Sequence, residues 1–174
     1  MYAAMLTGFF SNCKYLTPKI YNHIVSHLEL HRVRCSCGHA GCLIRHGYYS
    51  RKLKLRYGTY SFCILRVKCR ECGHTHAILP DSVVPYSQIP VDIQHKLLLY
   101  PLGSNELNEI MDNNSDITES DVLHIRARFR RYWKARLDAA FAELNSSLQS
   151  ILDRCYSSYS RQFMQIKRGV YLRI

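Results

Sequence analysis

Acidic residues are scarce in this sequence of 174 residues, in which 13 Asp and Glu stand against 24 Lys and Arg. The formal net charge of +11 at pH 7 indicates an anionic partner, and nucleic acid is the commonest partner of that kind. The alternative is a basic protein without such a partner. Metal-dependent cleavage needs clustered carboxylates, and the only cluster here sits where acids commonly cap a helix. We therefore expect no enzymatic activity.

Long apolar runs are also missing. No stretch reaches the roughly 18 apolar residues that a membrane-spanning helix needs. Residues 1–10 are apolar but lack the basic start and the long apolar core of a signal peptide. We therefore expect a cytoplasmic protein in a reducing compartment, where its eight cysteines serve metal binding and not disulfides.

The charge is uneven along the chain. Residues 1–80 hold 12 Lys and Arg against 2 acids, residues 81–121 hold 1 against 8, and residues 122–174 hold 11 against 3. Two basic segments around an acidic one suggest two contact surfaces joined by a packing module. We expect an N-terminal helix with a small β domain over 1–80, a proline-rich linker over 81–90, a helical domain over 91–153 and a tail over 154–174.

Two close cysteine pairs carry the strongest signal in the chain. Each pair ends in a cysteine followed by glycine, Gly38 in the first and Gly73 in the second. Zn²⁺ prefers four ligands in a tetrahedron, and a short cysteine pair supplies two thiolates from one tight turn. The glycine permits the positive φ of such a turn. We predict a structural zinc ion, closed to catalysis, held by Cys35, Cys37, Cys69 and Cys72.

Other assignments of these cysteines stay open. The first pair is one residue shorter than usual, so Cys42 competes as a partner of Cys37. Further candidate ligands are His39, His46, His74 and His76. The alternative is that the cysteines are reduced and buried and bind no metal. This explains the isolated Cys13, Cys63 and Cys155 well, but it explains the two cysteine pairs poorly.

A hairpin pattern lies between the cysteine pairs. Residues 43–49 suggest a strand and its turn, residues 51–56 and 60–68 suggest two strands around Tyr57-Gly58, and residues 76–80 suggest a third. Two cysteine turns joined by a hairpin make a zinc ribbon. Cations alternate with leucines on the first hairpin strand, beside several tyrosines, and would suit a phosphate backbone; the alternative is a solvated edge. These cations are Arg51, Lys52, Lys54 and Arg56.

Helical patterns flank the ribbon. Thr17-Pro18 starts a helix that we expect to end near Glu29. His23, His27 and His31 form a stripe along it that could bind metal or be an exposed polar face. After residue 90 we expect a helix ending near Pro101 and a second one capped by Ser104.

A third helix of about 27 residues is predicted to begin at a capping box over residues 118–121. Its first half is rich in cations, and a short helix, a tight turn and an arginine-rich helix together suggest a helix-turn-helix that reads the major groove of DNA. The alternative is an amphipathic core helix with a solvated basic face. The predicted nucleic-acid-binding residues on this helix are Arg126, Arg128, Arg130, Arg131 and Lys134.

The runs over residues 35–38, 46–51, 66–80 and 83–90 resemble a family of bacterial mobile-element zinc-ribbon proteins. They are similar to the N-terminal zinc-binding part of insertion-sequence transposases. The resemblance implies a ribbon, then a helix-turn-helix, then a nuclease domain with three acidic metal ligands. Only Asp153 is acidic after the predicted long helix, and too little chain remains for that nuclease domain. The expectation is therefore a transposition accessory or regulatory factor without a catalytic domain.

We expect an α+β fold and a zinc-containing protein that binds double-stranded DNA. Its expected protein partners are further copies of the same chain, in a homo-oligomer, or the transposition machinery. Two alternatives come from other classes. One is an adaptor that binds proteins through the ribbon and the acidic middle segment. The other is a binder of RNA or single strands, which basic strands with tyrosines also suit.

Overall fold

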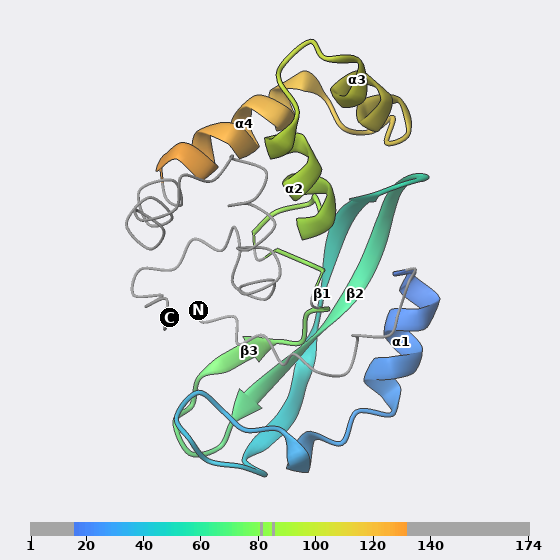
Figure 1. Cartoon of the computed structure of the whole chain (residues 1–174). Helices are drawn as coiled ribbons and strands as arrows, with labels where there is room; N and C mark the ends of the chain where they lie inside the picture. The colour runs from blue at the N-terminus through green and yellow to red at the C-terminus, as the bar shows by residue number, and fades with distance from the viewer. Residues whose placement is uncertain (1–15, 81, 85, 132–174) are drawn as a thin grey trace. The chain divides into compact units, whose positions relative to one another are not determined.

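The computed structural model describes residues 16–80, 82–84 and 86–131 (Figure 1). These residues form a mixed α+β structure with one antiparallel sheet, in the strand order β1-β2-β3. The elements are α1 (Pro18–Ser26), a 3₁₀ turn (Leu30–Arg32), β1 (Leu43–Leu55), β2 (Gly58–Cys69), β3 (Thr75–Ala77), α2 (Val91–Leu99), α3 (Asn105–Asp112) and α4 (Glu119–Phe129).

The described chain divides into two compact units. The first, called here the sheet unit, contains the residues up to Leu53 and from Tyr60 to Val83. The second, called the helical unit, contains residues 54–59 and the residues from Val84 onward. The tip of the β1–β2 hairpin therefore belongs with the helices and not with the rest of the sheet.

Local capping chemistry starts α1 where the sequence predicts it. The hydroxyl of Thr17 accepts a hydrogen bond from the backbone N–H of Ile20 at 3.2 Å, and Pro18 occupies the first turn. The helix ends at Ser26, so the predicted end near Glu29 is wrong by one turn. Leu28 turns inward just after the helix and is buried, and the 3₁₀ turn follows it.

The hairpin is confirmed, but its turn is one residue earlier than predicted: Arg56 and Tyr57 form the turn, and Gly58, with a φ of 127°, is the first residue of β2. The break predicted after residue 49 is wrong, because β1 runs unbroken from Leu43 to Leu55. Gly47, with a φ of 132°, is accommodated within the strand without ending it. The third strand is shorter than predicted, and it pairs antiparallel with residues 66–68 of β2.

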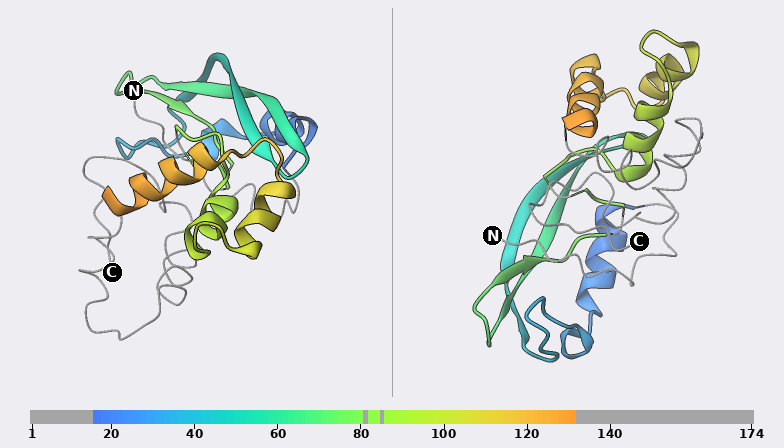
Figure 2. Two further views of the ribbon diagram at one scale, coloured as in Figure 1. Left: turned by 90° about the horizontal axis from the view of Figure 1, so that it is seen from above. Right: turned by 60° about the vertical axis from the view of Figure 1, so that its left-hand side comes forward.

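The core of the sheet unit lies between the inner face of the hairpin and α1, which runs beside the sheet (Figure 2). Tyr21 of α1 is fully buried and meets the ring of Phe62 edge to face, with 6.1 Å between centroids. Its hydroxyl donates to the carbonyl of Ile78 and accepts from the N–H of Leu65, both at 2.9 Å. One phenol therefore ties α1 to β2 and to the chain after β3.

Replacing Tyr21 with Phe keeps the ring but removes both hydrogen bonds. We expect the Tyr21→Phe variant to lose about 1–3 kcal/mol in free energy of unfolding, because the buried Leu65 N–H loses its partner. Urea denaturation followed by circular dichroism would measure this loss. The control is Tyr60→Phe at an exposed position of β2, for which we expect a change within about 0.5 kcal/mol. Equal stability of the two variants would contradict the bridging role of Tyr21.

In the helical unit, α2 packs against both α3 and α4 (Figure 2). The predicted caps are confirmed: Ser104 accepts from the N–H of Leu107, and Thr118 and Asp121 form a reciprocal capping box at the start of α4. The shared core is apolar and consists of Val84, Ile89, Val91, Ile93, Leu97, Leu98, Leu107, Ile117, Val122, Ile125 and Phe129. The continuation of the predicted long helix toward residue 148 lies outside the described residues.

The proline-rich linker predicted over 81–90 is packed and contains two turns, and is not the extended chain that its prolines suggest: the N–H of Val83 donates to the Pro80 carbonyl, and the N–H of Ser87 donates to the Val84 carbonyl. Its described residues, 82–84 and 86–90, form neither helix nor strand. Val84 and Ile89 are nevertheless buried, and the buried side-chain amide of Gln94 donates to the Ile89 carbonyl at 2.6 Å and to the Ser87 hydroxyl at 3.0 Å. The buried side chain of Gln94 thus fixes residues 87–89 to α2.

Among the described helices, none combines the length and the apolar character that crossing a membrane requires.

Candidate metal centre and basic surface

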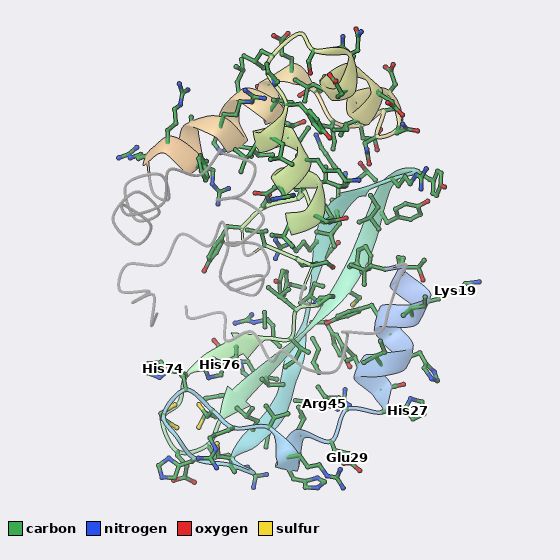
Figure 3. The ribbon with its side chains drawn as sticks, in the orientation of Figure 1. Lys19, His27, Glu29, Arg45, His74 and His76 are labelled. Atoms are coloured by element: carbon green, nitrogen blue, oxygen red, sulfur yellow. The ribbon has the colours of Figure 1, made fainter. Side chains whose placement is uncertain are left out.

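Two tight turns bring four cysteine sulfurs together at the end of the sheet unit (Figure 3). The sulfurs of Cys35, Cys37, Cys69 and Cys72 all lie within 4.8 Å of one another. The Sγ atoms of Cys35 and Cys72 are 3.7 Å apart, and those of Cys37 and Cys69 are 3.8 Å apart. The sequence predicts this set of four, including the short spacing of the first pair.

The distances of 3.7 and 3.8 Å are those of a tetrahedral thiolate site. Metal–sulfur bonds of about 2.3 Å at tetrahedral angles place neighbouring sulfurs about 3.8 Å apart. A disulfide would need about 2.05 Å. The arrangement therefore fits four thiolates around one ion, and the four cysteines could hold a metal ion.

The two turns are built alike. The N–H of Cys35 donates to the carbonyl of His39 at 2.9 Å, and the N–H of Cys69 donates to the carbonyl of His74 at the same distance. The glycine after each pair has a positive φ, 95° at Gly38 and 70° at Gly73, as predicted. In the second turn the N–H of Cys72 also points at the Cys69 sulfur, 3.4 Å away, and would stabilise a thiolate there.

Other predicted ligands lie around the four sulfurs. The buried His76 places Nε2 3.3 Å from the Cys35 sulfur, and His39 places Nδ1 3.4 Å from the Cys37 sulfur. The buried Cys42, the rival considered for the first pair, lies 3.3 Å from the Cys69 sulfur and donates to the His39 carbonyl. These residues surround the centre and would orient its ligands.

The thiols in and beside the candidate metal centre differ in their pKa values. The backbone N–H of Cys72 holds the pKa of Cys69 down at about 6. At Cys72 the N–H of His74 lowers the pKa, but burial and the neighbouring thiols outweigh it and raise the value to about 12. Burial beside Cys69 raises the pKa of Cys42 to about 11. A metal ion bound by all four cysteines would have to displace protons from such thiols, so its binding releases protons.

His76 offers a test of the shell around the sulfurs. A ring N–H donated to the Cys35 sulfur stabilises a thiolate, and loss of such a partner typically weakens metal binding about 10–100-fold. We therefore expect His76→Phe to weaken metal affinity at least about tenfold, measured by competition with a chelator. The control, His46→Phe at an exposed position of β1, should leave the affinity unchanged. Equal affinities in both variants would contradict this role.

The four predicted cations of the hairpin differ in their surroundings. Lys52 and Arg56 are exposed, and the guanidinium of Arg56 lies over the Tyr57 ring, 5.4 Å from its centroid. Arg51 is half-buried. Lys54 is half-buried as well and forms an ion pair with Asp121 of α4, with 2.7 Å between Nζ and Oδ2. Lys54 therefore already has an anionic partner inside the fold.

The cations of α4 also differ. Arg126 donates to the carbonyls of Leu97 and Tyr100, at the C-terminal end of α2, where carbonyls lack helical partners. Arg128 is half-buried, and Arg130 and Arg131 are exposed. Lys134 lies outside the described residues. The exposed cations Arg130 and Arg131 thus lie just after the C-terminal end of α4, whereas Arg126 lies within α4 and holds it against α2.

Sequence reasoning missed the partners of Lys54 and Arg126 within the fold. Asp121 is 67 positions from Lys54, and Leu97 is 29 positions from Arg126. The hydroxyl of Thr59 likewise donates to the Asp116 carboxylate, 57 positions away. The sequence held one signal for the Lys54 contact: the acidic residues at the start of α4, which attract a cation when another part of the chain packs beside them.

Comparison with known families adds one match. A family profile described as a domain of unknown function, DUF6431, matches residues 35–107. Searches of curated proteins and of solved structures found no match. The matched segment runs from the first cysteine turn to α3 and includes all four sulfurs of the candidate metal centre. This chain is thus similar to DUF6431 over the cysteine centre, the sheet and the first helices of the helical unit.

Proposed function

We propose that this chain is a zinc-ribbon protein that binds double-stranded DNA. The observation that carries the proposal is the group of four sulfurs within 4.8 Å of one another, in a chain whose hairpin has exposed cations. Four thiolates favour Zn²⁺ and leave no open position for substrate. The zinc ion would then fix the sheet unit, and binding would depend on the protein surface.

The contacts of the cations suggest which of them meet DNA. Lys52, Arg56, Arg130 and Arg131 are exposed and suit phosphate contacts. Lys54 and Arg126 contact groups within the fold, so their replacement would first affect stability.

The order α3, turn, α4 supports a helix-turn-helix, in which α4 would be the reading helix. Its first turn, however, carries Glu119 and Asp121, and acids there would repel phosphates. The cations Arg130 and Arg131 follow its C-terminal end. We therefore propose that α4 approaches DNA through that end and not through its N-terminus.

The biological role rests on the resemblance to insertion-sequence transposases. Under this proposal the protein is an accessory or regulatory factor of a mobile element, and the zinc ribbon and helices supply DNA binding without catalysis. Supporting this role are the basic charge of +11 and the cysteine turns that carry the resemblance.

The test is DNA binding measured by fluorescence anisotropy on a duplex at several salt concentrations. Affinity should fall by about 0.9 log units per log unit of salt for each phosphate neutralised. The double variant Lys52→Ala/Arg56→Ala should bind about 3–30-fold more weakly and lower the slope by about 2. The control, Lys96→Ala at an exposed position of α2 in the acidic segment, should change neither quantity. A salt-independent affinity, or a double variant that binds as the wild type does, would contradict the proposal.

Exposed tyrosines favour single-stranded nucleic acid as a second candidate. The exposed fractions of Tyr48, Tyr57 and Tyr60 are 54%, 76% and 37%, and the Arg56–Tyr57 pair offers a stacking surface for a base. Tyr57→Leu would then weaken binding to a single-stranded probe by roughly 1–3 kcal/mol and leave duplex binding unchanged. Equal effects on both probes would count against this candidate.

A further inference from the structure

A second group of metal-ligating side chains lies at the C-terminal end of α1, apart from the cysteines. His23 is in the helix, His27 is its C-cap residue four positions later, and both side chains are exposed. Their ring centroids are 4.5 Å apart, with 49° between the ring planes. Figure 3 shows His27 at the C-terminal end of α1, on the side away from the sheet.

We propose that His23 and His27 form a second, exchangeable metal site for a divalent transition-metal ion such as Ni²⁺, Cu²⁺ or Zn²⁺. Imidazole suits these ions, and the rings of His23 and His27 are in contact. Both side chains are exposed, so water would fill the remaining coordination positions. The site would therefore take up and release its ion freely, unlike a closed centre of four thiolates.

Hydrogen bonds fix the tautomer of His27. Its Nδ1 lies 2.8 Å from the carbonyl oxygen of His23. A carbonyl oxygen can only accept, so Nδ1 carries a proton, and in the neutral ring the lone pair is then on Nε2. The Ser26 hydroxyl donates to the same carbonyl at 2.7 Å and lies 3.1 Å from Nδ1, where it can accept from the ring. A ring held by a hydrogen bond through one nitrogen, with the other nitrogen binding the ion, is the usual arrangement of a metal-binding histidine.

The separation of the two rings matches ligation of one ion. Two imidazoles with metal–nitrogen bonds of about 2.0–2.1 Å have their centroids about 4.5 Å apart when the two bonds are at about 90°, as in the square-planar sites of Cu²⁺ and Ni²⁺. This is the separation of the His23 and His27 rings. The two rings would therefore keep their separation around such an ion, which lowers the conformational cost of binding.

The third histidine of the predicted stripe does not share this arrangement. His31 belongs to the 3₁₀ turn Leu30–Arg32, whereas His27 is the C-cap residue of α1 itself. The sequence pattern of three histidines thus reduces to a pair in the structure. The proposed site has two protein ligands.

The experiment uses the full chain with zinc in its cysteine centre and titrates it with NiCl₂ by isothermal calorimetry. One Ni²⁺ per chain should bind in the wild type, and His23→Gln and His27→Gln should each weaken this binding at least about tenfold. Gln keeps the helix and the exposed polar surface. The matched control is His124→Gln, at an exposed position of α4, which should bind as the wild type does. Zinc content measured before and after each titration shows whether the cysteine centre was disturbed.

A spectroscopic measurement distinguishes binding of one ion by the His23–His27 pair from binding by single histidines elsewhere on the surface. Cu²⁺ bound at this site should show electron paramagnetic resonance couplings to two imidazole nitrogens in the wild type and to one in His27→Gln. Unchanged Ni²⁺ affinity in both α1 variants would overturn the proposal. So would an equal loss of binding in His124→Gln, or a Cu²⁺ spectrum that is the same in the wild type and His27→Gln.

Discussion

Replacing Cys69 with Ser is expected to release the metal ion and to lower the free energy of unfolding of the sheet unit by at least about 4 kcal/mol. Cys69 is fully buried at the end of β2, and its sulfur lies near the other three. Metal binding contributes about 10–16 kcal/mol of apparent folding free energy in isolated zinc-finger peptides. The sheet unit has an apolar core of its own around Tyr21 and Phe62, so part of its stability should remain.

Metal content and stability must be measured together. Elemental analysis should find one zinc ion per wild-type chain and none in Cys69→Ser. Replacement of zinc by Co²⁺ should give the visible spectrum of a tetrahedral cobalt thiolate in the wild type only. Urea unfolding followed by circular dichroism should then show a lower midpoint for the variant.

The control for this prediction is another cysteine of the same strand. Cys63 lies on β2, is exposed and stands outside the group of four sulfurs. Cys63→Ser should keep the zinc ion and the wild-type midpoint, which separates metal loss from the general effect of replacing sulfur with oxygen. A Cys69→Ser protein that still carries one zinc ion, or that unfolds at the wild-type midpoint, would refute the metal centre as a source of stability.

The cysteine centre could be predicted because its geometry is encoded locally. Each turn needs two cysteines, a glycine with positive φ and a few backbone hydrogen bonds, and all of these lie within six residues of one another. The helix starts at Thr17, Ser104 and Thr118 were predictable for the same reason, since a cap involves residues three positions apart.

Contacts between distant residues were not predictable in this way. Alternation along β1 indicates that Lys52 and Lys54 share a face, but it does not show that α4 places Asp121 against Lys54. Helical spacing likewise groups Arg126 with Arg130, although the first contacts backbone carbonyls of α2 and the second is exposed. A periodic pattern identifies a face, and only the fold shows what that face meets.

The second large effect is expected at Asp121. Its carboxylate accepts from the Thr118 N–H at 2.9 Å in the capping box and from the Lys54 ammonium at 2.7 Å. Asp121→Ala removes both interactions and leaves the half-buried ammonium of Lys54 without its anionic partner. We expect a loss of about 2–3 kcal/mol in the free energy of unfolding of the helical unit, measured by urea denaturation.

The pH dependence follows from the same contacts. Burial raises the pKa of Asp121, but the Lys54 ammonium and the N–H and hydroxyl of Thr118 outweigh burial and hold this pKa below its ordinary value. A carboxyl with a lowered folded pKa stabilises the fold above its unfolded pKa of about 3.9 and loses this contribution as pH falls through the folded value. The stability difference between the wild type and Asp121→Asn should therefore be constant above about pH 5 and shrink below about pH 4.

A double-mutant cycle isolates the ion pair from the cap. Asn at position 121 can still accept from Thr118, and Lys54→Met removes the ammonium while keeping an apolar stem, so the coupling between these two changes reports the ion pair itself. We expect a coupling of about 0.5–2 kcal/mol, because the side chains are only 18% and 28% exposed. Asp112→Asn, at an exposed position at the end of α3, should show neither coupling to Lys54 nor a pH effect. Additive losses in the cycle would mean that Lys54 and Asp121 act separately, and Lys54 would again be available to bind phosphate.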